Sequence, residues 1–223
     1  AGVVNFVAHS AADAPAVVEA LIAHPAVKRV NFTGSSRVGR IIGELSGKHL
    51  KPCLLELGGK APFIVLEDAD LEEAVAAAAF GAFMNQGQIC MSTERIIVVE
   101  KIADEFLKRF TAKVKSLPMG DPTKGNFPIG ACVEEKTVAH VKELISDATG
   151  KGATVLVGGK GPGGAFFEPT VIDGVQKGMR IYGEESFGPI VGVLRARDVD
   201  HAVELANDSE YGLSAAVFSR NID

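Results

Sequence analysis

The sequence has few cysteines and no basic cluster, and both facts narrow the classes of protein to which it can belong. Its three cysteines, Cys53, Cys90 and Cys132, form no Cys-x-x-Cys pair, and its five histidines show no ligand spacing. A disulfide scaffold and a zinc site are therefore not expected, and a reduced, cytoplasmic setting is. The net charge of −5 provides no basic stripe to neutralise phosphates, so nucleic acid is not an expected partner.

The sequence also lacks a long apolar run, and its first residues do not predict a leader segment. Its longest apolar run, residues 74–84, is shorter than the about 20 residues that cross a bilayer, so no contact with the membrane interior is expected. No charged segment followed by an apolar one begins the sequence, and a signal peptide is not expected. The remaining composition, 47% hydrophobic and 23% charged, is typical of a globular protein.

Strand-like and helix-like runs alternate along the chain, which predicts an α/β fold with a mostly parallel sheet. The predicted strands are 27–32, 53–57, 63–66, 95–100, 153–157, 170–172, 190–194 and 213–218. The predicted helices are 36–46, 71–86, 103–117, 134–149 and 199–207. Asp70 and Glu73 have the spacing of a capping box at the start of the second helix.

Two short segments carry side chains suited to covalent catalysis. Cys90 stands in Asn-Gln-Gly-Gln-Ile-Cys-Met-Ser at residues 85–92, and Glu56 in Leu-Leu-Glu-Leu-Gly-Gly-Lys at residues 54–60. A thiolate can attack an electrophilic carbon, a carboxylate can activate water, and glycines let the backbone approach a substrate. The residues alone leave alternatives open. Cys90 could be a buried structural thiol, and Glu56 is either a strand residue that faces solvent or a buried carboxyl whose raised pKa suits a base.

A third segment, Glu-Glu-Ser-Phe-Gly-Pro at residues 184–189, completes a set that resembles the NAD(P)-dependent aldehyde dehydrogenase superfamily in motif and in order. The resemblance runs along essentially the whole chain. Residues 83–95 are most similar to the branch that oxidises aromatic aldehydes such as vanillin, salicylaldehyde and benzaldehyde. The resemblance implies NAD or NADP as cofactor, a small-molecule aldehyde as substrate and a homo-oligomeric intact protein.

The resemblance also implies roles for single residues in the reaction. Cys90 would be the nucleophile, forming a thiohemiacetal and then a thioester, and Glu56 the base for the water that hydrolyses the thioester. Glu56 could also assist deprotonation of the thiol. The substrate tunnel would be lined at Met84, Ile89 and Met91, whose default role without the family is packing in the core.

The implied cofactor site uses residues of several segments. Glu185 would hold the nicotinamide ribose and Phe187 would pack beside it, whereas a solvated loop acid and a packing aromatic are the alternatives. Gly34 and Ser35 lie between a predicted strand and helix, where free N–H groups favour phosphate, and would lie near the pyrophosphate. Gly58 resembles the residue whose backbone approaches the nicotinamide.

The implied organisation is a part of a Rossmann-like dinucleotide-binding domain at residues 1–57 and a catalytic domain at 58–223. In the family, an oxyanion-hole Asn and a ribose-binding Lys lie upstream of residue 1, so the 223-residue chain alone is expected to be catalytically incomplete. Two rival hypotheses remain: a thiol esterase that uses Cys90 and Glu56, and a structural piece that binds no cofactor.

Overall fold

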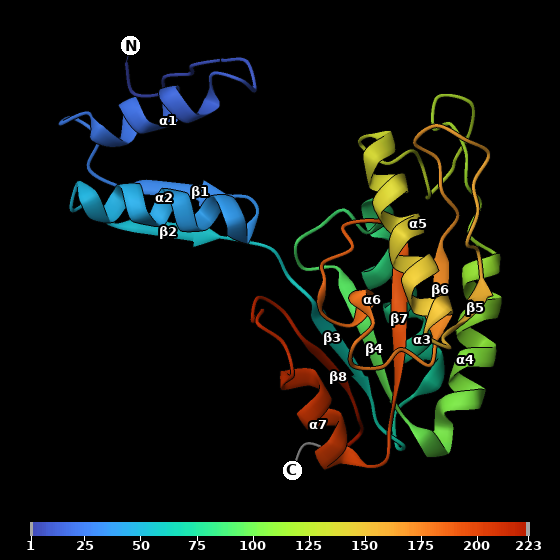
Figure 1. Ribbon diagram of the computed structural model, residues 1–223. Helices are drawn as coiled ribbons and strands as arrows, with labels where there is room; N and C mark the ends of the chain where they lie inside the picture. Colours follow the sequence, from blue (N-terminus) through green and yellow to red (C-terminus); the bar gives the residue numbers. More distant parts are fainter. Residues whose placement is uncertain (1, 222–223) are drawn as a thin grey trace. The chain divides into compact units, whose positions relative to one another are not determined.

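The computed structural model describes residues 2–221 (Figure 1). The chain divides into two compact units, Ala1–Gly58 and Gly59–Asp223. We refer to them as the N-terminal unit and the C-terminal unit. Among the described residues, no helix combines the length and the apolar character needed to cross a membrane.

The N-terminal unit is built around one β-α-β segment. Its elements are α1 (Ala14–Ala23), β1 (Val30–Thr33), α2 (Ser36–Lys48) and β2 (Cys53–Glu56). β1 and β2 pair in parallel, with Val30 opposite Cys53 and Thr33 opposite Glu56. The parallel pairing requires a crossover, and α2 provides it.

The C-terminal unit contains a six-stranded sheet with the order β5-β6-β7-β4-β3-β8. In chain order the strands are β3 (Ala61–Val65), β4 (Thr93–Val99), β5 (Thr154–Val157), β6 (Thr170–Asp173), β7 (Ile190–Ala196) and β8 (Ala216–Phe218). Every neighbouring pair is parallel except β5 with β6. β3, β4 and β7 therefore form a parallel centre whose amino ends share one edge.

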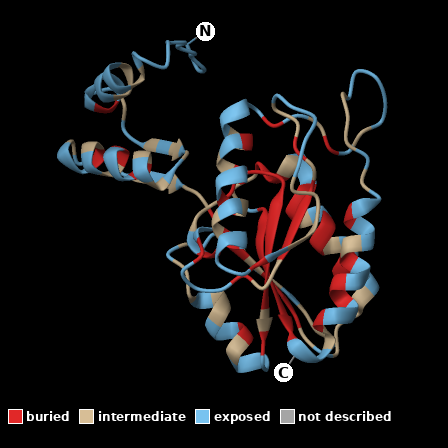
Figure 2. Cartoon of the chain, turned by 45° about the vertical axis from the view of Figure 1, so that its right-hand side comes forward, coloured by how far each residue is buried: buried red, intermediate tan, exposed pale blue. Residues whose placement is uncertain are grey.

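Helices cover both faces of this sheet, so its central strands are buried on both sides (Figure 2). The helices are α3 (Leu71–Phe83), α4 (Glu100–Lys115), α5 (Glu135–Gly150), α6 (Arg180–Gly183) and α7 (Val199–Asn207). Along β4, Ile96 and Val98 pack in the cluster with α3 and α4, whereas Ile97 packs in the cluster with α5 and α7. This alternation follows from the strand period of two residues, and a continuous apolar run fills both cores.

The predicted α/β fold with a mostly parallel sheet is confirmed, and most elements lie within a few residues of their predicted bounds. The cap at Asp70 is also confirmed, since its side chain accepts hydrogen bonds from the N–H groups of Glu72 and Glu73. Helices α1 and α6 were not predicted. α6 has only four residues, and α1 begins after Asp13 without a side-chain cap.

The predicted starts of three elements were wrong by three residues each. β1 begins at Val30 rather than 27, β8 at Ala216 rather than 213, and α4 begins at Glu100 rather than 103. β8 is an edge strand that pairs only where it faces Phe63, Ile64 and Val65 of β3. The residue of β3 that would face residue 215 is Pro62, which has no N–H group to offer the ladder, and the run before Ala216 stays irregular.

Candidate functional site

Three loops gather at the amino ends of the parallel centre of the C-terminal unit. Gly59 and Lys60 precede β3, residues 85–92 precede β4, and residues 184–189 precede β7. Because β3 and β7 both pair in parallel with β4, the loops before them meet at one edge of the sheet. The fold thus brings together three segments that are far apart in the sequence.

The loop before β4 opens with a left-handed turn. Asn85, Gln86 and Gly87 have φ angles of 51°, 59° and 68°, and α3 therefore ends at Phe83 instead of continuing to residue 86 as predicted. Two consecutive non-glycine residues in this conformation cost on the order of 1–2 kcal/mol each. Strain of this kind persists only where the surroundings hold it.

The side chain of Gln88 holds this turn from two sides. Its Nε2 donates to the carbonyl oxygen of Asn85 at 3.1 Å, and its Oε1 accepts from the N–H of Val133 at 2.8 Å. The Asn85 side chain donates in return to the Gln88 carbonyl oxygen at 3.2 Å. At Gly87 a Cβ atom would clash with the carbonyl oxygen of Gly188, so the turn packs directly against the loop before β7.

Cys90 lies half-buried just after this turn. Gly59 packs against it so closely that a Cβ atom at residue 59 would clash with the Cys90 carbonyl oxygen. Of the other thiols, Cys53 is half-buried in β2, and Cys132 is buried, which raises the pKa of its thiol. Since thiolate fraction and access together govern reactivity, Cys132 is poorly suited to act as a nucleophile.

Apolar side chains flank Cys90 along the chain. Met84 is 49% and Met91 61% exposed, and Ile89 is half-buried. Met84 lines a hollow with Phe80 and Leu117, and Cys90 does not belong to the lining of that hollow. Exposed methionines provide a flexible apolar surface of the kind that suits the apolar part of a small molecule.

Glu185 occupies the loop before β7, half-buried. Its Oε1 accepts a hydrogen bond from the N–H of Gly59 at 3.0 Å. Burial raises the pKa of its carboxyl, and the bond from Gly59 opposes that shift. Phe187 follows with a φ of 44° and 43% of its surface exposed. Gly59 therefore contacts both the Cys90 segment and the Glu185 carboxylate.

A buried polar cluster, formed by Lys60, Glu94 and Ser186, lies in the same three loops and was missed by the sequence analysis. Lys60 Nζ donates to Glu94 Oε2 at 2.7 Å, and the two side chains are 0% and 5% exposed. Ser186 Oγ donates to the same Oε2 at 2.6 Å. One feature of the sequence could have revealed this cluster. Lys60 and Glu94 each stand at the start of an apolar run that is predicted to be a buried strand, where a charged side chain needs a partner.

Arg95, next to Glu94, joins the start of β4 to α7 through hydrogen bonds. Its guanidinium donates to the carbonyl oxygens of Leu205 and Ala206 at 2.9 Å each, and its Nε to that of Lys60 at 3.2 Å. Carbonyl groups at the end of a helix lack partners within the helix, and Arg95 supplies them. Arg95 is 1% exposed, so its role is to join elements rather than to meet a ligand.

The remaining predicted site residues belong to the N-terminal unit. Ser35 caps α2, its side chain accepting from the N–H of Val38 at 3.3 Å. The N–H of Gly34 donates to the carbonyl oxygen of Glu56 at 3.0 Å. Glu56 ends β2 with an exposed side chain, the solvent-facing one of the two alternatives left open by the sequence, and Gly58 is half-buried.

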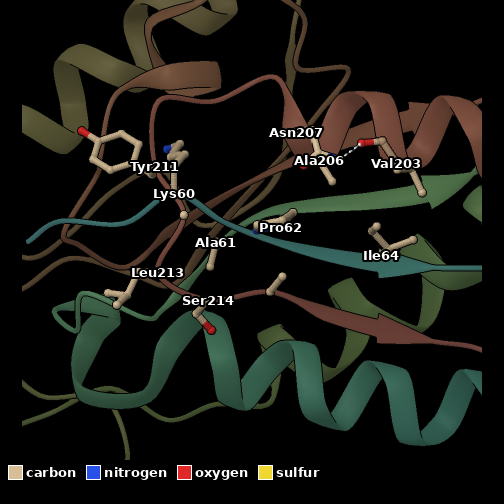
Figure 3. Close-up of a pocket in the computed structure, with 12 residues that line it drawn as sticks. Lys60, Ala61, Pro62, Ile64, Val203, Ala206, Asn207, Tyr211, Leu213 and Ser214 are labelled. Atoms are coloured by element: carbon tan, nitrogen blue, oxygen red, sulfur yellow. Dashed lines mark hydrogen bonds between the residues drawn. The ribbon is translucent and has the colours of Figure 1, made fainter.

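A separate hollow lies between β3, α7 and the loop before β8 (Figure 3). Lys60 and Tyr211 lie at one end and Ile64 and Val203 further along, and burial raises the pKa of Tyr211. Neither Cys90 nor Glu185 belongs to its lining. Across residues 2–221, no group of three or more His, Cys, Asp or Glu side chains is placed to hold a metal ion.

Comparison with known proteins connects these loops to a family. The model of the aldehyde dehydrogenase family matches residues 1–223. A vanillin dehydrogenase of Pseudomonas fluorescens is 57% identical over 220 residues, which cover 99% of this chain and 45% of the relative. A salicylaldehyde dehydrogenase of Pseudomonas putida is 51% identical over 224 residues, covering 100% of this chain and 46% of the relative.

Solved structures agree with the sequence comparison. A salicylaldehyde dehydrogenase from Pseudomonas putida G7, complexed with salicylaldehyde, superposes with a TM-score of 0.92 at 51% identity and covers 96% of this chain and 44% of that one. A betaine aldehyde dehydrogenase from Staphylococcus aureus, in complex with NAD⁺, has a TM-score of 0.86 at 37% identity, covering 92% and 42%. The chain thus spans slightly less than half the length of these relatives.

Proposed function

We propose, since the chain belongs to the aldehyde dehydrogenase family, that the protein carrying it oxidises an aldehyde to a carboxylic acid with NAD or NADP. The observation that carries the proposal is the pair of contacts at Gly59. Its N–H binds the Glu185 carboxylate, and its Cα packs against the carbonyl of Cys90. The backbone of the thiol-bearing residue and a carboxylate suited to a ribose thereby both contact Gly59.

Cys90 is the proposed nucleophile. Its thiolate adds to the carbonyl carbon of the aldehyde, and the resulting thiohemiacetal loses a hydride to become a thioester bound to Cys90. Water then cleaves the carbon–sulfur bond, releasing the acid and restoring the thiol. Partial exposure of Cys90, against the burial and raised pKa of Cys132, supports this assignment.

Glu56 is the proposed base for the hydrolytic water. Its carboxylate is exposed in the N-terminal unit, and an ionised carboxylate can accept a proton from water. The amide variant Glu56→Gln would retain the shape of the side chain without this capacity, which makes the assignment testable.

Glu185 and Phe187 are the proposed contacts of the cofactor in the C-terminal unit. A bound nicotinamide supplies the hydride acceptor. An acceptor carboxylate that is half-buried and held by Gly59 suits the hydroxyl groups of a ribose, and the exposed ring of Phe187 suits packing beside it. The residues present thus fit the nicotinamide end of the cofactor.

Residues 1–57 are the proposed part of a dinucleotide-binding domain and 58–223 the catalytic domain. The β1-α2-β2 crossover and the start of α2 after Gly34 and Ser35 support a role near the pyrophosphate, because helix N-termini attract phosphate. Gly58 is the proposed approach point for the nicotinamide. A homo-oligomeric state belongs to the same proposal.

An aromatic aldehyde is the proposed substrate class. The names of the relatives at 57% and 51% identity support it, as do the apolar residues Met84, Ile89 and Met91 that flank Cys90 in the sequence. We expect the full-length protein to prefer vanillin or salicylaldehyde over acetaldehyde by about 10-fold or more in kcat/KM. A preference for acetaldehyde would contradict the substrate class without affecting the reaction type.

Rapid mixing of the full-length protein with aldehyde and cofactor tests the reaction itself. For Glu56→Gln we expect a burst of NAD(P)H close to one per Cys90, followed by turnover about 100-fold slower than in the wild type, because acylation is retained and the slowed hydrolysis of the thioester limits turnover. Glu44→Gln, an exposed carboxylate of the same unit, should change neither phase. Equal losses of burst and turnover in Glu56→Gln would contradict the role of Glu56, and turnover by Cys90→Ala would contradict the covalent mechanism.

A further inference from the structure

The buried carboxylate of Glu94 is bonded to the loop that carries Glu185 and Phe187. Its oxygens accept hydrogen bonds from the backbone N–H of Ser186 at 2.9 Å and of Phe187 at 3.2 Å, and from the Ser186 hydroxyl at 2.6 Å. Lys60 completes the shell at 2.7 Å and also donates to Ser186 Oγ at 3.3 Å. The two donor N–H groups immediately follow Glu185 in the chain.

Only an ionised carboxylate satisfies this set of donors. It is acceptor-only and offers about four lone-pair positions, whereas an amide offers one acceptor oxygen and would direct an NH₂ group toward Lys60 or Ser186. Glu94 is 4% exposed, so water does not compensate for a lost bond. The loop position therefore depends on the charge of Glu94 and not only on its volume.

Glu94 also has a fixed relation to the nucleophile, because it is the second residue of β4 and follows Cys90 by four positions. Lys60, its counterion, directly follows Gly59, which contacts both Cys90 and Glu185. The buried pair thus joins the starts of β3 and β4 to the loop before β7.

We propose that Glu94, neutralised by Lys60, is a positioning residue that holds the loop of Glu185 and Phe187 in register with Cys90, so that the nicotinamide half of the cofactor is aligned for hydride transfer. The proposal rests on the proposed function, in which Glu185 holds the nicotinamide ribose. Glu94 acts through the backbone of residues 186 and 187 and does not touch the reactants. Because transfer rates fall steeply with misalignment, a small shift of this loop is sufficient to affect the reaction.

The test uses the full-length protein and two ligands that separate the halves of the cofactor. ADP lacks the nicotinamide and its ribose, so its affinity reports only on the adenosine half. For Glu94→Gln we expect hydride transfer in a single turnover to slow about 10-fold or more, while the Kd of ADP and the rate of Cys90 alkylation without cofactor stay within about twofold. A merely structural role would weaken ADP binding as well.

Glu67→Gln is the matched control, since Glu67 forms an exposed pair with Lys101 at 2.8 Å in the same unit. It should leave all three measurements unchanged. If Glu94→Gln does not fold, Ser186→Ala takes its place. That variant removes the hydroxyl bond at 2.6 Å and retains the backbone bonds, so a smaller, about threefold, slowing of hydride transfer with unchanged ADP affinity is expected.

Glu185→Gln separates this inference from the proposed function. Slowed hydride transfer in Glu185→Gln combined with a normal rate in Glu94→Gln or Ser186→Ala, or with a parallel loss of ADP affinity in either variant, would overturn the positioning role alone. Normal hydride transfer in Glu185→Gln would instead overturn the ribose role of Glu185, and the present proposal with it. The combination that supports both is slow transfer in Glu185→Gln and Glu94→Gln with unchanged ADP binding.

Discussion

A lysine–glutamate pair lies at or just beyond each end of the neighbouring strands β3 and β4, and one pair is buried whereas the other is exposed. At the amino ends, Lys60 and Glu94 are 2.7 Å apart and 0% and 5% exposed. At the carboxyl ends, Lys101 and Glu67 are 2.8 Å apart and 74% and 55% exposed. The bond lengths are nearly equal, so the difference between the two regions is one of solvation.

Solvation determines what each pair contributes. An exposed pair is screened by water and contributes about 0–1 kcal/mol to the free energy of unfolding. Burying two charges costs several kcal/mol per ion, which is recovered only if further hydrogen bonds satisfy both groups. Glu94 has such bonds to Ser186 and Phe187. The buried pair therefore lies at the edge of the sheet where charged groups are held in place despite the free-energy cost of burying them. The candidate site lies at the same edge.

The largest difference between the two ends is expected when the lysine of each ion pair is removed and the free energy of unfolding is measured. Lys60→Met leaves the Glu94 carboxylate buried without its counterion, and we expect a loss of about 3–5 kcal/mol in the free energy of unfolding. Lys101→Met should lose less than about 1 kcal/mol. Denaturant titrations of the full-length protein measure both. Similar small losses in the two variants would mean that the buried edge relaxes or hydrates when Lys60 is removed.

The next largest effect is expected from a change in packing at the amino ends of β3 and β4. Gly59→Ala introduces a Cβ that clashes with the Cys90 carbonyl oxygen, and we expect about 1–3 kcal/mol of destabilisation with a loss of turnover up to about 100-fold. Gly183→Ala is the control, because a Cβ there meets nothing within 4 Å. Unchanged turnover in Gly59→Ala would contradict the close coupling of Gly59 to the nucleophile segment.

The sequence was sufficient to predict the sheet because burial on both faces gives each central strand a continuous apolar run. It was insufficient where a distant contact sets the local conformation. The end of α3 depends on the bond between Gln88 and Val133, which are 45 positions apart. The Lys60–Glu94–Ser186 cluster joins positions 34 and 92 residues apart. No local sequence pattern encodes such pairings. The family resemblance predicted the residues around Cys90 and Glu185, but it does not describe the hydrogen bonds that hold these two loops in place.

The smallest effect is expected from the ionisation of one carboxyl group at each end, Glu185 and Asp70. The two groups should change the stability of the fold with pH in opposite directions. Burial raises the pKa of Glu185 above its ordinary value of 4.5, so the folded state binds this proton more tightly than the unfolded chain. Its contribution to stability is present below about pH 4.5 and is lost as the pH rises through the folded pKa. At the other end, hydrogen bonds from the Glu73 N–H and then from Arg220 lower the pKa of Asp70 below 3.8. Its contribution is present above that value and is lost as the pH falls through the folded pKa.

The pH dependence of the Tm of two amide variants of the full-length protein, Glu185→Gln and Asp70→Asn, tests these opposite directions. Glu185→Gln should raise the Tm at pH 7 by about 1–2 °C, and the gain should vanish toward pH 4, because only the ionised wild-type carboxylate is disfavoured by burial. Asp70→Asn should lower the Tm slightly at pH 7 and lose that effect as the pH approaches 3, since the amide retains the cap but not the charge. The same variants separate stability from function, because Glu185→Gln is expected to gain stability while hydride transfer slows. A lower Tm for Glu185→Gln at pH 7 would mean that the charge of Glu185 stabilises the fold, and the contrast between the two ends of β3 would then be limited to the lysine–glutamate pairs.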